Sequence, residues 1–400
     1  MTAERRIHWA VLPSDEAGTS GRLSGHSVRV GDQTLIWSEE EAQPSARVAR
    51  TGVVASGLSL VTQVGRAFQE AHPDVPVVLD HGRHLVVEGG EALRGKDDTC
   101  WRVEPMPADP VVVDRPEPRA RRVDPVVENV LVGVARPPYE SNLTWISELE
   151  TRHSLSDGFR QAADRAEMAL TTLGYATSRQ TVSVGGGQSA NVIADRPGQA
   201  SDRQVVLVTA HLDSVNQAGG TKAPGADDNG SGAAGVLLLA SALAAHEWQN
   251  DLRLILFGGE EQGLFGSKHY VAGLSPDERG RIRAVLNMDM IGVRNGEEPG
   301  VLLEGAPVSK ALIDDLAAAA ATYTGLRVET SLNPFASDHV PFIVAGVPAV
   351  LTIEGNDSAN GTIHSANDLL THIDYGLALE ILRMNAAALA GWLRPVEVAG

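Results

Sequence analysis

The chain has 400 residues, of which 43% are hydrophobic and 21% are charged, an ordinary globular composition with enough length for two domains and a sizeable core. Its formal net charge of -18 at pH 7 disfavours nucleic acid as a partner, because binding to phosphate backbones needs clustered Lys and Arg. The single cysteine, Cys100, excludes an intramolecular disulfide and a thiolate zinc site, and no apolar run approaches the ~18 residues that a membrane-spanning helix needs.

Residues 1–128 predict a small β-rich accessory domain. The stretches 28–37 and 77–89 each read as two alternating apolar strands around a turn that contains glycine. The stretch 58–72 between them has helical spacing. Residues 103–125 are rich in Pro and Arg and predict a linker or extended arm, because Pro removes backbone donors and blocks helix. This domain could cap an active site, inhibit it or mediate oligomerisation.

Residues 140–396 predict a second domain in which helices and strands alternate. We expect strands at 176–184, 189–198, 204–214, 251–259, 282–292, 300–305 and 347–355, and helices at 157–175, 230–248, 309–324, 337–345 and 374–393. The near-continuous apolar strands are typical of a sheet that is covered on both faces. The fold class is therefore α/β, with a mostly parallel, mixed central sheet flanked by helices and the additional β-rich N-terminal domain.

The N-terminal stretch MTAERRIHWAVLPSDEAG starts with basic residues but has no apolar segment and no small-residue cleavage site. We therefore expect no secretory signal. The acidic net charge and the lack of a membrane span favour a cytoplasmic protein without a membrane partner. No pattern in the sequence indicates an oligomeric state.

Several polar side chains stand where the predicted strands end or in the loops between them: His211, Asp213, Asp227, Asp228, Glu260, Glu261, Asp289 and His364. Open α/β sheets bind ligands at the carboxyl ends of their strands. A single histidine after a strand is more often a hydrogen-bonded core or surface residue, and an Asp before Asn-Gly is more often a turn former. A carboxylate inside an apolar strand, such as Asp289, must be protonated, paired or bound to a cation.

Together these residues supply two imidazoles and three or four carboxylates without a thiolate. Oxygen and nitrogen ligands in this ratio suit Zn²⁺, Mn²⁺ or Co²⁺, and they are numerous enough for two ions that share one carboxylate. The glycine-rich loop around Asp228 would let the backbone bend sharply enough to bring a short side chain between two ions. An EF-hand is excluded, because the loop lacks the acidic ladder of that motif.

Five motifs in a fixed order carry a family resemblance: AHLDS (210–214), APGADDNGSG (223–232), GGEEQGLFGS (258–267), LNMDMIG (286–292) and TIHSANDLL (362–370). The chain from about 140 to 395 resembles the zinc-dependent bacterial aminopeptidases of the leucine and aminoacyl aminopeptidase type. Their dinuclear metallo-exopeptidase superfamily also includes glutamate carboxypeptidases and glutaminyl cyclases. The resemblance leaves the first third of the chain unmatched.

The resemblance implies two Zn²⁺ ions, or Mn²⁺ or Co²⁺ in their place, with His211 and Asp289 on one ion, Glu261 and His364 on the other and Asp228 between them. It further implies that Glu260 is the general base for a metal-bridging water. A separate base is needed because a carboxylate that is bound to a metal is a poor one. Asp213, two residues after His211, is expected to lie on the same side of the strand and to orient the imidazole.

Two positions depart from the family pattern. Peptide-hydrolysing relatives often have a Tyr where this chain has Ile363, and some have an Arg where it has Ala336. Both changes remove polar groups that stabilise an oxyanion or place a substrate. Asp338 and His339 match a further family-like segment, for which a helix-capping role and a catalytic role are equally compatible with the sequence.

The leading hypothesis is a metal-dependent exopeptidase that hydrolyses the N-terminal peptide bond. The first alternative is a carboxypeptidase or small-molecule amide hydrolase on the same fold, and a cluster of Arg in 331–339 that would favour the carboxypeptidase is missing. A glutaminyl-cyclase-like acyl transferase comes next, but it typically uses one metal and needs fewer ligands. A non-catalytic binding module would not need Glu260 beside five ligands, and a serine hydrolase would need a Gly-x-Ser-x-Gly motif, which the chain lacks.

Overall fold

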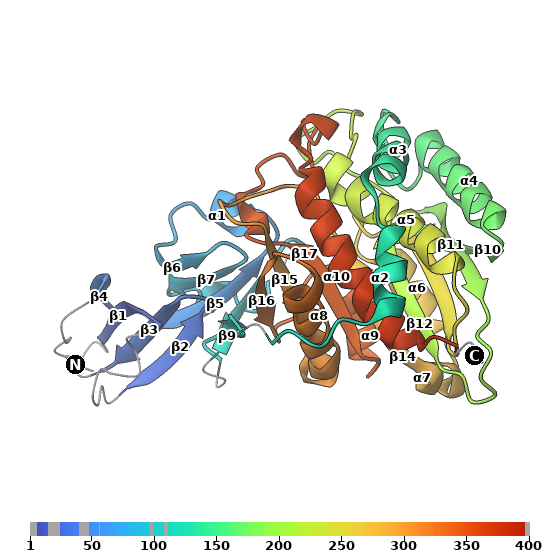
Figure 1. The fold of residues 1–400 in the computed structure, drawn as a ribbon. Coiled ribbons are helices and arrows are strands. Elements are labelled where there is room, and N and C mark those ends of the chain that lie inside the picture. The colour runs from blue at the N-terminus through green and yellow to red at the C-terminus, as the bar shows by residue number, and fades with distance from the viewer. Residues whose placement is uncertain are drawn as a thin grey trace. The chain divides into compact units, whose positions relative to one another are not determined.

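The structure is a computed structural model that describes residues 6–14, 25–39, 48–55, 57–96, 99–107, 111–117 and 119–396. The chain forms two compact units (Figure 1). Unit 1 consists of residues 1–116 together with two segments from the C-terminal half, 329–336 and 356–361. Unit 2 consists of residues 117–328, 337–355 and 362–400.

Unit 2 contains a mixed sheet whose strands follow the order β10 (Ala176–Val184), β11 (Gly187–Arg196), β13 (Asp251–Phe257), β12 (Val205–His211), β14 (Ile282–Met288), β17 (Ala349–Glu354) and β15 (Gly300–Glu304). The four strands β13, β12, β14 and β17 run parallel to their neighbours. The antiparallel pairs lie outside them, between β10, β11 and β13 on one side and between β17 and β15 on the other. The expected α/β fold with a mixed sheet is confirmed.

Helices cover this sheet. Helix α5 (Gly232–Ala244) packs on β12, β13 and β14, beside α10 (Tyr375–Leu393) and α2 (Pro125–Val132) (Figure 1). Helix α9 (His339–Val344) packs on β14 and β17 and contacts α6 (Phe265–Ala272). The remaining helices of unit 2 are α3 (Arg136–Ser147), α4 (Asp157–Thr172), α7 (Pro276–Arg281) and α8 (Lys310–Tyr323).

The core of unit 2 reflects burial of the central strands on both faces. Leu207 of β12 and Val285 of β14 join a cluster that includes Phe342 of α9. Their neighbours along β12, Val206 and Val208, point to the other face and are fully buried as well. These strands are apolar along nearly their whole length because both of their faces are buried.

Unit 1 contains two antiparallel-rich sheets. One has the order β16 (Arg327–Ser331), β9 (Val111–Asp114), β2 (His26–Val30), β3 (Gln33–Ser38), β1 (Ile7–Pro13) and β4 (Arg50–Val54), where the last three residues of β16 belong to unit 1. The other has the order β6 (Val77–His81), β7 (His84–Glu88), β5 (Leu58–Gln63) and β8 (Trp101–Pro105). Residues from both sheets share one hydrophobic core, so they pack face to face.

The helix expected over 58–72 is wrong in its first part. Leu58–Gln63 forms strand β5, and only Ala67–Ala71 forms a helix, α1. All six residues of β5 are buried, because the strand packs on both faces. A short apolar run without alternation cannot be separated from helix by its spacing alone. The two hairpins expected at 28–37 and 77–89 are present as β2–β3 and β6–β7.

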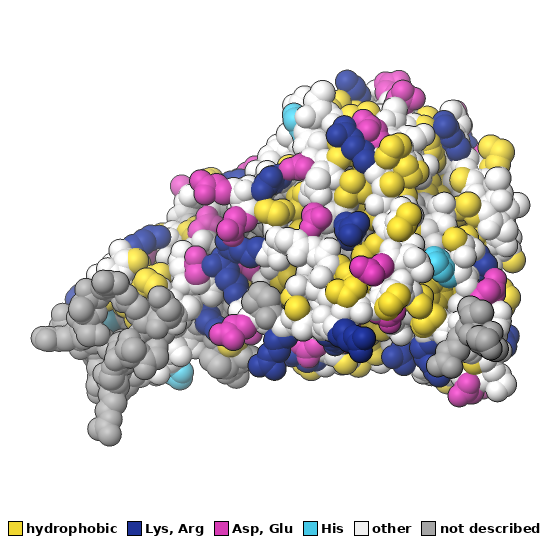
Figure 2. Space-filling model, viewed as in Figure 1, with side chains coloured by type: hydrophobic (Ala, Val, Ile, Leu, Met, Phe, Trp, Pro, Cys, Tyr) yellow, Lys and Arg dark blue, Asp and Glu magenta, His cyan; other side chains and the backbone are white. Residues whose placement is uncertain are grey.

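The surface of the molecule carries mixed charge on the face that Figure 2 shows. Acidic and basic side chains are interspersed there, and hydrophobic side chains reach the surface between them. Val132 of α2 is the most exposed of the large hydrophobic residues of that helix, at 80%. Among the described residues, no helix combines the length and hydropathy needed to cross a membrane.

Candidate functional site

Three neighbouring parallel strands of unit 2 end at the same edge of the sheet, and polar residues follow each of them. Strand β12 ends at His211, β13 leads through Gly258 and Gly259 to Glu260, and β14 leads directly to Asp289. The carboxyl edge of a parallel sheet is where open α/β folds place their ligands. The sequence order of the motifs thus becomes a spatial cluster.

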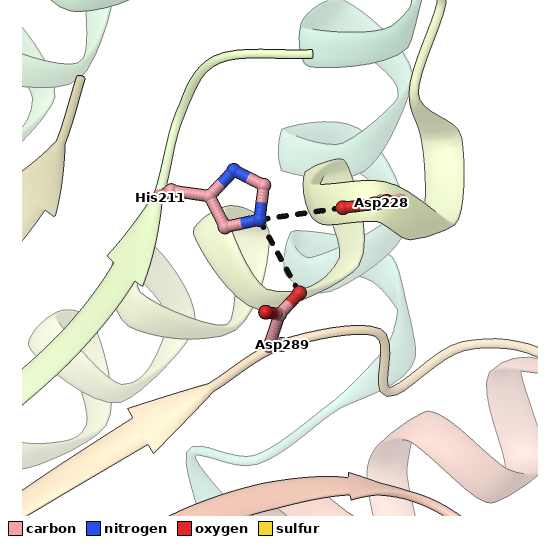
Figure 3. A group of neighbouring side chains, drawn as sticks. All are labelled: His211, Asp228 and Asp289. Carbon is pink, nitrogen blue, oxygen red and sulfur yellow. Dashed lines mark hydrogen bonds and ion pairs between the residues drawn. The ribbon is translucent and has the colours of Figure 1, made fainter. Parts of the chain in front are cut away.

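The first group of this cluster consists of His211, Asp228 and Asp289 (Figure 3). The Nε2 atom of His211 lies 3.3 Å from Oδ1 of Asp228 and 3.3 Å from Oδ1 of Asp289. All three residues are buried. Their side chains come from different elements and point toward one another, so they could hold a metal ion together.

The second group consists of Asp228, Glu261 and His364. The Nε2 atom of His364 lies 3.1 Å from Oδ2 of Asp228 and 3.2 Å from Oε2 of Glu261. Asp228 therefore faces one histidine with each of its two carboxylate oxygens. The structure thus brings all five sequence-predicted ligands into two groups that share Asp228. A carboxylate with one oxygen toward each group is able to bridge two cations.

Glu260 lies beside the first group without belonging to either. Its Oε2 atom is 4.0 Å from Nε2 of His211. Burial raises the pKa of Glu260 well above its ordinary value, against the lowering effect of the His211 imidazole. A buried carboxylate with a raised pKa holds a proton more strongly than an exposed one, which is the property that a general base at neutral pH requires.

The donor set fits zinc. Two ligands at 2.0–2.2 Å from a tetrahedral ion lie ~3.3–3.6 Å apart, and the distances from the His211 and His364 rings to their carboxylates are 3.1 to 3.3 Å. The second carboxylate oxygen of Glu261, Oε1, is buried and has no hydrogen-bond partner among the described residues. Burial raises the pKa of Glu261 to about 7, so this carboxylate is costly to keep charged unless a cation binds it.

The pKa values of the two histidines show that carboxylates outnumber positive groups around them. Burial lowers the pKa of His211, but the carboxylates of Glu260 and Asp289 outweigh burial and hold that pKa well above its ordinary value. Burial likewise lowers the pKa of His364, and Glu261 and Asp228 outweigh it. Both rings thus lie in surroundings that favour a positive charge, which a divalent cation would also satisfy.

Asp213 holds the site in a way that the sequence did not predict in detail. The Nδ1 atom of His211 donates to the backbone carbonyl of Asp213 at 3.1 Å, and the carboxylate lies farther from that nitrogen, at 3.7 Å. The carboxylate oxygens accept the backbone N–H groups of Glu260 at 3.3 Å and of Glu261 at 3.2 Å. Asp213 therefore connects the end of β12 to the paired glutamates.

A chain of buried hydrogen bonds orients Asp289. Ser337 donates to Oδ2 of Asp289 at 2.6 Å, and Asn287 donates to the Ser337 hydroxyl at 2.9 Å. Thr209 in turn donates to the Asn287 side chain at 2.8 Å. With Oδ2 occupied by Ser337, the Oδ1 atom of Asp289 is the one left to face His211.

The loop that carries Asp228 is fixed by Asp368. Its carboxylate accepts the backbone N–H groups of Asp227 and Asp228, each at 2.9 Å. The side chain of Asp227 turns away and accepts the N–H of Gly292 at 2.8 Å, so Asp227 is a neighbour of the two groups and no member of them. The peptide bond between Asp228 and Asn229 is cis. Asp368 thus positions the loop that carries the shared carboxylate of Asp228.

The structure separates Asp338 from His339. Asp338 precedes α9 but gives it no side-chain cap, so the capping interpretation is wrong. Its carboxylate is fully buried, and burial raises its pKa to about 7. His339 points elsewhere, with its Nε2 atom 3.3 Å from Oε1 of the buried Glu304.

Ile363 packs against an apolar cluster that contains Met290.

Sequence reasoning missed three buried residues that shape the site: Arg152, Asn287 and Ser337. Asn287 gave a signal, because a polar residue inside an apolar strand needs a buried partner. Ser337 lies beside a motif that the sequence singled out. Arg152 stands in a polar stretch between helices, and nothing in its sequence neighbours distinguishes it from an exposed arginine.

Comparisons with known proteins agree with this geometry. Residues 191–389 match the model of peptidase family M28. The resemblance that the five motifs carried is thereby confirmed. The leupeptin-inactivating enzyme 1 of Streptomyces exfoliatus is 35% identical over 206 residues, which cover 50% of this chain and 44% of that enzyme.

Two further proteins extend the comparison. An aminopeptidase of Pseudomonas aeruginosa is 39% identical over 164 residues, which cover 39% of this chain and 29% of the relative. The structure of BSAP, a zinc aminopeptidase from Bacillus subtilis, matches 66% of this chain and 94% of its own with a TM-score of 0.54 at 18% identity, a likeness of fold. The chain thus spans less than half the length of the Streptomyces enzyme and of the Pseudomonas aminopeptidase.

Proposed function

We propose that the chain is a metal-dependent aminopeptidase that holds two Zn²⁺ ions and hydrolyses the N-terminal peptide bond of peptides. The observation that carries this proposal is the arrangement of two potential ligand groups around Asp228 with Glu260 beside them and outside both. The match of residues 191–389 to the model of peptidase family M28 supports it, as do the aminopeptidases among the relatives.

The five residues His211, Asp228, Glu261, Asp289 and His364 would hold the ions. Bound there, the cations would lower the pKa of a water molecule and polarise the carbonyl of the peptide bond. Glu260 accepts the proton of the attacking water and returns it to the leaving amine, a role worth roughly 10²- to 10⁴-fold in rate. Asp213 keeps Glu260 in place through the backbone N–H that it accepts.

Three features weigh on the alternatives. Ile363 lies against Met290 and its apolar neighbours, so it provides no polar group for an oxyanion. This absence leaves a carboxypeptidase or small-molecule amide hydrolase as the second candidate. A glutaminyl-cyclase-like transferase is less favoured, because five ligands exceed what one ion needs. Glu260 beside a complete ligand set argues against a binding module.

The test is mass spectrometry of the products from a mixed peptide pool, with free or acetylated N-termini, after incubation with zinc-loaded protein. Stepwise loss of N-terminal residues from free peptides alone is the expected result. Shortening from the C-terminus, or equal attack on both pools, would overturn the aminopeptidase assignment and favour the second candidate. The Glu260→Gln variant, run in parallel, controls for a contaminating peptidase.

A further inference from the structure

Arg152 is a fully buried arginine whose guanidinium binds only neutral backbone carbonyls among the described residues. Its Nε atom donates to Leu212 at 2.8 Å, and its Nη2 atom donates to Gly225 at 2.9 Å. Its Nη1 atom donates to Pro224 and, at 3.3 Å, to Ile146. An arginine in this position ties together segments that are distant in the sequence.

Three of these carbonyls, those of Leu212, Pro224 and Gly225, belong to the two loops that carry the shared site, and the fourth, that of Ile146, belongs to α3. Leu212 lies between His211 and Asp213, and Gly225 lies three residues before Asp228. The backbone of Arg152 strengthens the same connection. Its N–H donates to the Ser214 hydroxyl at 3.0 Å, and its carbonyl accepts the N–H of Ser214 at 3.3 Å.

Ser214 completes the link by donating to the carbonyl of Ala223 at 2.7 Å. The loop after β12 and the loop before Asp228 are thus joined through Arg152 on one side and through Ser214 on the other. Gly225 has a φ of 52°, and a Cβ atom there would lie 3.0 Å from Nη2 of Arg152. The backbone at Gly225 therefore lies so close to the guanidinium of Arg152 that a side chain there would crowd it.

The charge of Arg152 acts on the site from a distance. Burial lowers the pKa of Arg152 to about 10, while the charges of Asp368, Asp213 and Asp228 oppose that effect. The guanidinium therefore stays charged at neutral pH. None of the described carboxylates lies within 4.0 Å of it, so no direct ion pair fixes its place; the carbonyls do.

We propose that Arg152 is a positioning residue that sets the separation of the His211 loop and the Asp228 loop, and so prepares both ligand groups to bind metal ions. This inference rests on the proposed metal site, but not on the peptidase reaction. It goes beyond the ligands themselves, because Arg152 touches none of the donor atoms.

Charge and geometry predict opposite effects when Arg152 is replaced. A positive charge near the site repels cations, so removing the charge alone would strengthen metal binding. Losing the three carbonyl bonds to the loops would let the loops separate and would weaken metal binding. Arg152→Met removes both the charge and the bonds, whereas Arg152→Lys keeps a charge but cannot reach the three loop carbonyls together with that of Ile146. The pair of variants therefore distinguishes the two effects.

The experiment measures zinc affinity of the intact chain by competition with a chromophoric chelator for wild type, Arg152→Lys and Arg152→Met. We expect both variants to bind zinc roughly 10- to 100-fold more weakly, the range found when residues that orient metal ligands are replaced. Arg253→Met is the matched control, because Arg253 is a partly buried arginine of β13 that pairs with Asp195 away from the site. It should leave the zinc affinity unchanged.

A second measurement follows the local opening of the two loops in the absence of metal. Amide hydrogen exchange of segments 211–214 and 223–228 should accelerate in both Arg152 variants and stay at the wild-type rate in Arg253→Met. Should the Arg152 variants fail to fold, Ser214→Ala removes one hydroxyl of the same link and should give a smaller change of the same sign.

Unchanged exchange and unchanged zinc affinity in a folded Arg152→Lys would overturn the proposal. Stronger zinc binding by Arg152→Met, with wild-type binding by Arg152→Lys, would also overturn it, because charge alone would then explain the effect. A wild-type chain that binds no zinc would refute the proposed function instead, and the exchange measurement would still decide whether Arg152 holds the two loops.

Discussion

At the scale of single residues, two adjacent glutamates have different surroundings. Glu261 lies 3.2 Å from His364 and belongs to a ligand group, whereas Glu260 lies 4.0 Å from His211 and belongs to none. Asp213 holds both backbones through the two N–H groups that it accepts. One side chain therefore fixes the backbone of both glutamates, while their carboxylates lie in different surroundings.

We expect Glu260→Gln to keep zinc affinity within a few-fold of wild type and to lower kcat by about 10²- to 10⁴-fold. Glu261→Gln should instead weaken zinc binding, because it removes a candidate ligand. Zinc titration and steady-state kinetics on a peptide substrate measure both effects. The opposite pattern, with metal lost in Glu260→Gln and kept in Glu261→Gln, would contradict this division.

The backbone of the site contains residues in a conformation that side chains rarely adopt. His364 has a φ of 52° and Met290, which follows Asp289, has a φ of 52°. Ala336, which precedes Ser337, has a φ of 46°. Non-glycine residues with positive φ cluster at functional sites, where surrounding contacts hold them in place. This strain could not be read from the sequence, since none of the three is a glycine or asparagine.

At the scale of elements, the Asp228 loop depends on Gly225. A Cβ atom at Gly225 would lie 2.4 Å from the backbone carbonyl oxygen of Asp228 and 2.6 Å from Cβ of Ser214. Gly346 also has a positive φ, of 78°, but a Cβ atom there would meet nothing within 4 Å. The two glycines separate the cost of the backbone conformation from the cost of the clash.

We therefore expect Gly346→Ala to cost about 1 kcal/mol of unfolding free energy, which is the penalty for the left-handed conformation alone. Gly225→Ala should cost clearly more and should weaken zinc binding, because the neighbouring backbone of Asp228 has to move. Urea unfolding and zinc titration provide the comparison. Equal losses in both variants would show that the close packing around Gly225 has no energetic weight.

Strand β16 and its neighbours in unit 1 provide a pH-dependent contribution to stability. Burial alone raises the pKa of Glu329, but hydrogen bonds and charge from His81 and Arg115 outweigh it and lower the pKa to about 2. The Glu329 side chain is 11% exposed and accepts from Arg115 at 2.7 Å. Because the charged form is favoured in the folded state, the contribution is present above the ordinary pKa of 4.5 and is lost as pH falls toward 2.

Glu329→Gln should lower the unfolding free energy at pH 7 by on the order of 2 to 3 kcal/mol. The loss should shrink between about pH 4.5 and pH 2, where wild type itself protonates this carboxyl. Denaturant unfolding at a series of pH values tests this. The exposed Glu140, which pairs with Arg136 on the surface of α3, is the control, and Glu140→Gln should give no measurable pH-dependent change. A parallel pH dependence in the two variants would contradict the assignment.

The sequence predicted the seven strands of the sheet in unit 2 and its helices α4, α5, α8, α9 and α10, because long apolar runs that alternate with helical patterns are strong local signals, but it did not predict α3, α6 and α7. It singled out the five candidate ligands because they stand at strand ends and in loops within recognisable motifs, and the structure brings them together in two groups. It failed for β5, whose burial on both faces removes alternation. It also missed α2, although Asp124 accepts the N–H of Val126 and Pro125 occupies the first helical turn, signals that the surrounding Pro-rich stretch obscured.

Arg152 and Ser337 could not be predicted for a different reason. The partners of Arg152 lie up to 73 positions away in the sequence, and those of Ser337 lie 48 and 50 positions away. Local patterns carry no information about contacts at such separations. Only the fold, which places the ends of β12 and β14 beside each other, creates these environments.

At the scale of the whole molecule, unit 1 is built from three separate parts of the chain. Arg83 connects the two later parts within this unit: it pairs with Asp357 at 3.2 Å and donates to the carbonyl of Phe335 at 2.8 Å. Arg83 is 3% exposed and Asp357 is 1% exposed. Segment 329–336 is further held by the pairing of β16 with β9.

We expect Arg83→Met to lower the unfolding free energy by about 3 to 5 kcal/mol, because it takes the arginine away from a buried carboxylate. The double variant Arg83→Met/Asp357→Asn should recover part of the loss, since the neutral amide needs no counter-charge. Equilibrium unfolding in urea measures both. A double variant that is less stable than the sum of the single changes would show that the pair is not the source of the effect.

The three-part composition of unit 1 has a consequence for any attempt to cut it away. The stretch from 119 to 124 is exposed, so a protease that cleaves there would break the covalent link after the N-terminal part. The released piece would nevertheless stay bound, because β9 remains paired with β16 and Arg83 remains paired with Asp357. Such a nicked protein would run as two fragments in denaturing electrophoresis and as one species in gel filtration. Deletion of the N-terminal third would strip segments 329–336 and 356–361 of their strand and side-chain partners, and these segments run directly into Ser337 and, three residues later, His364.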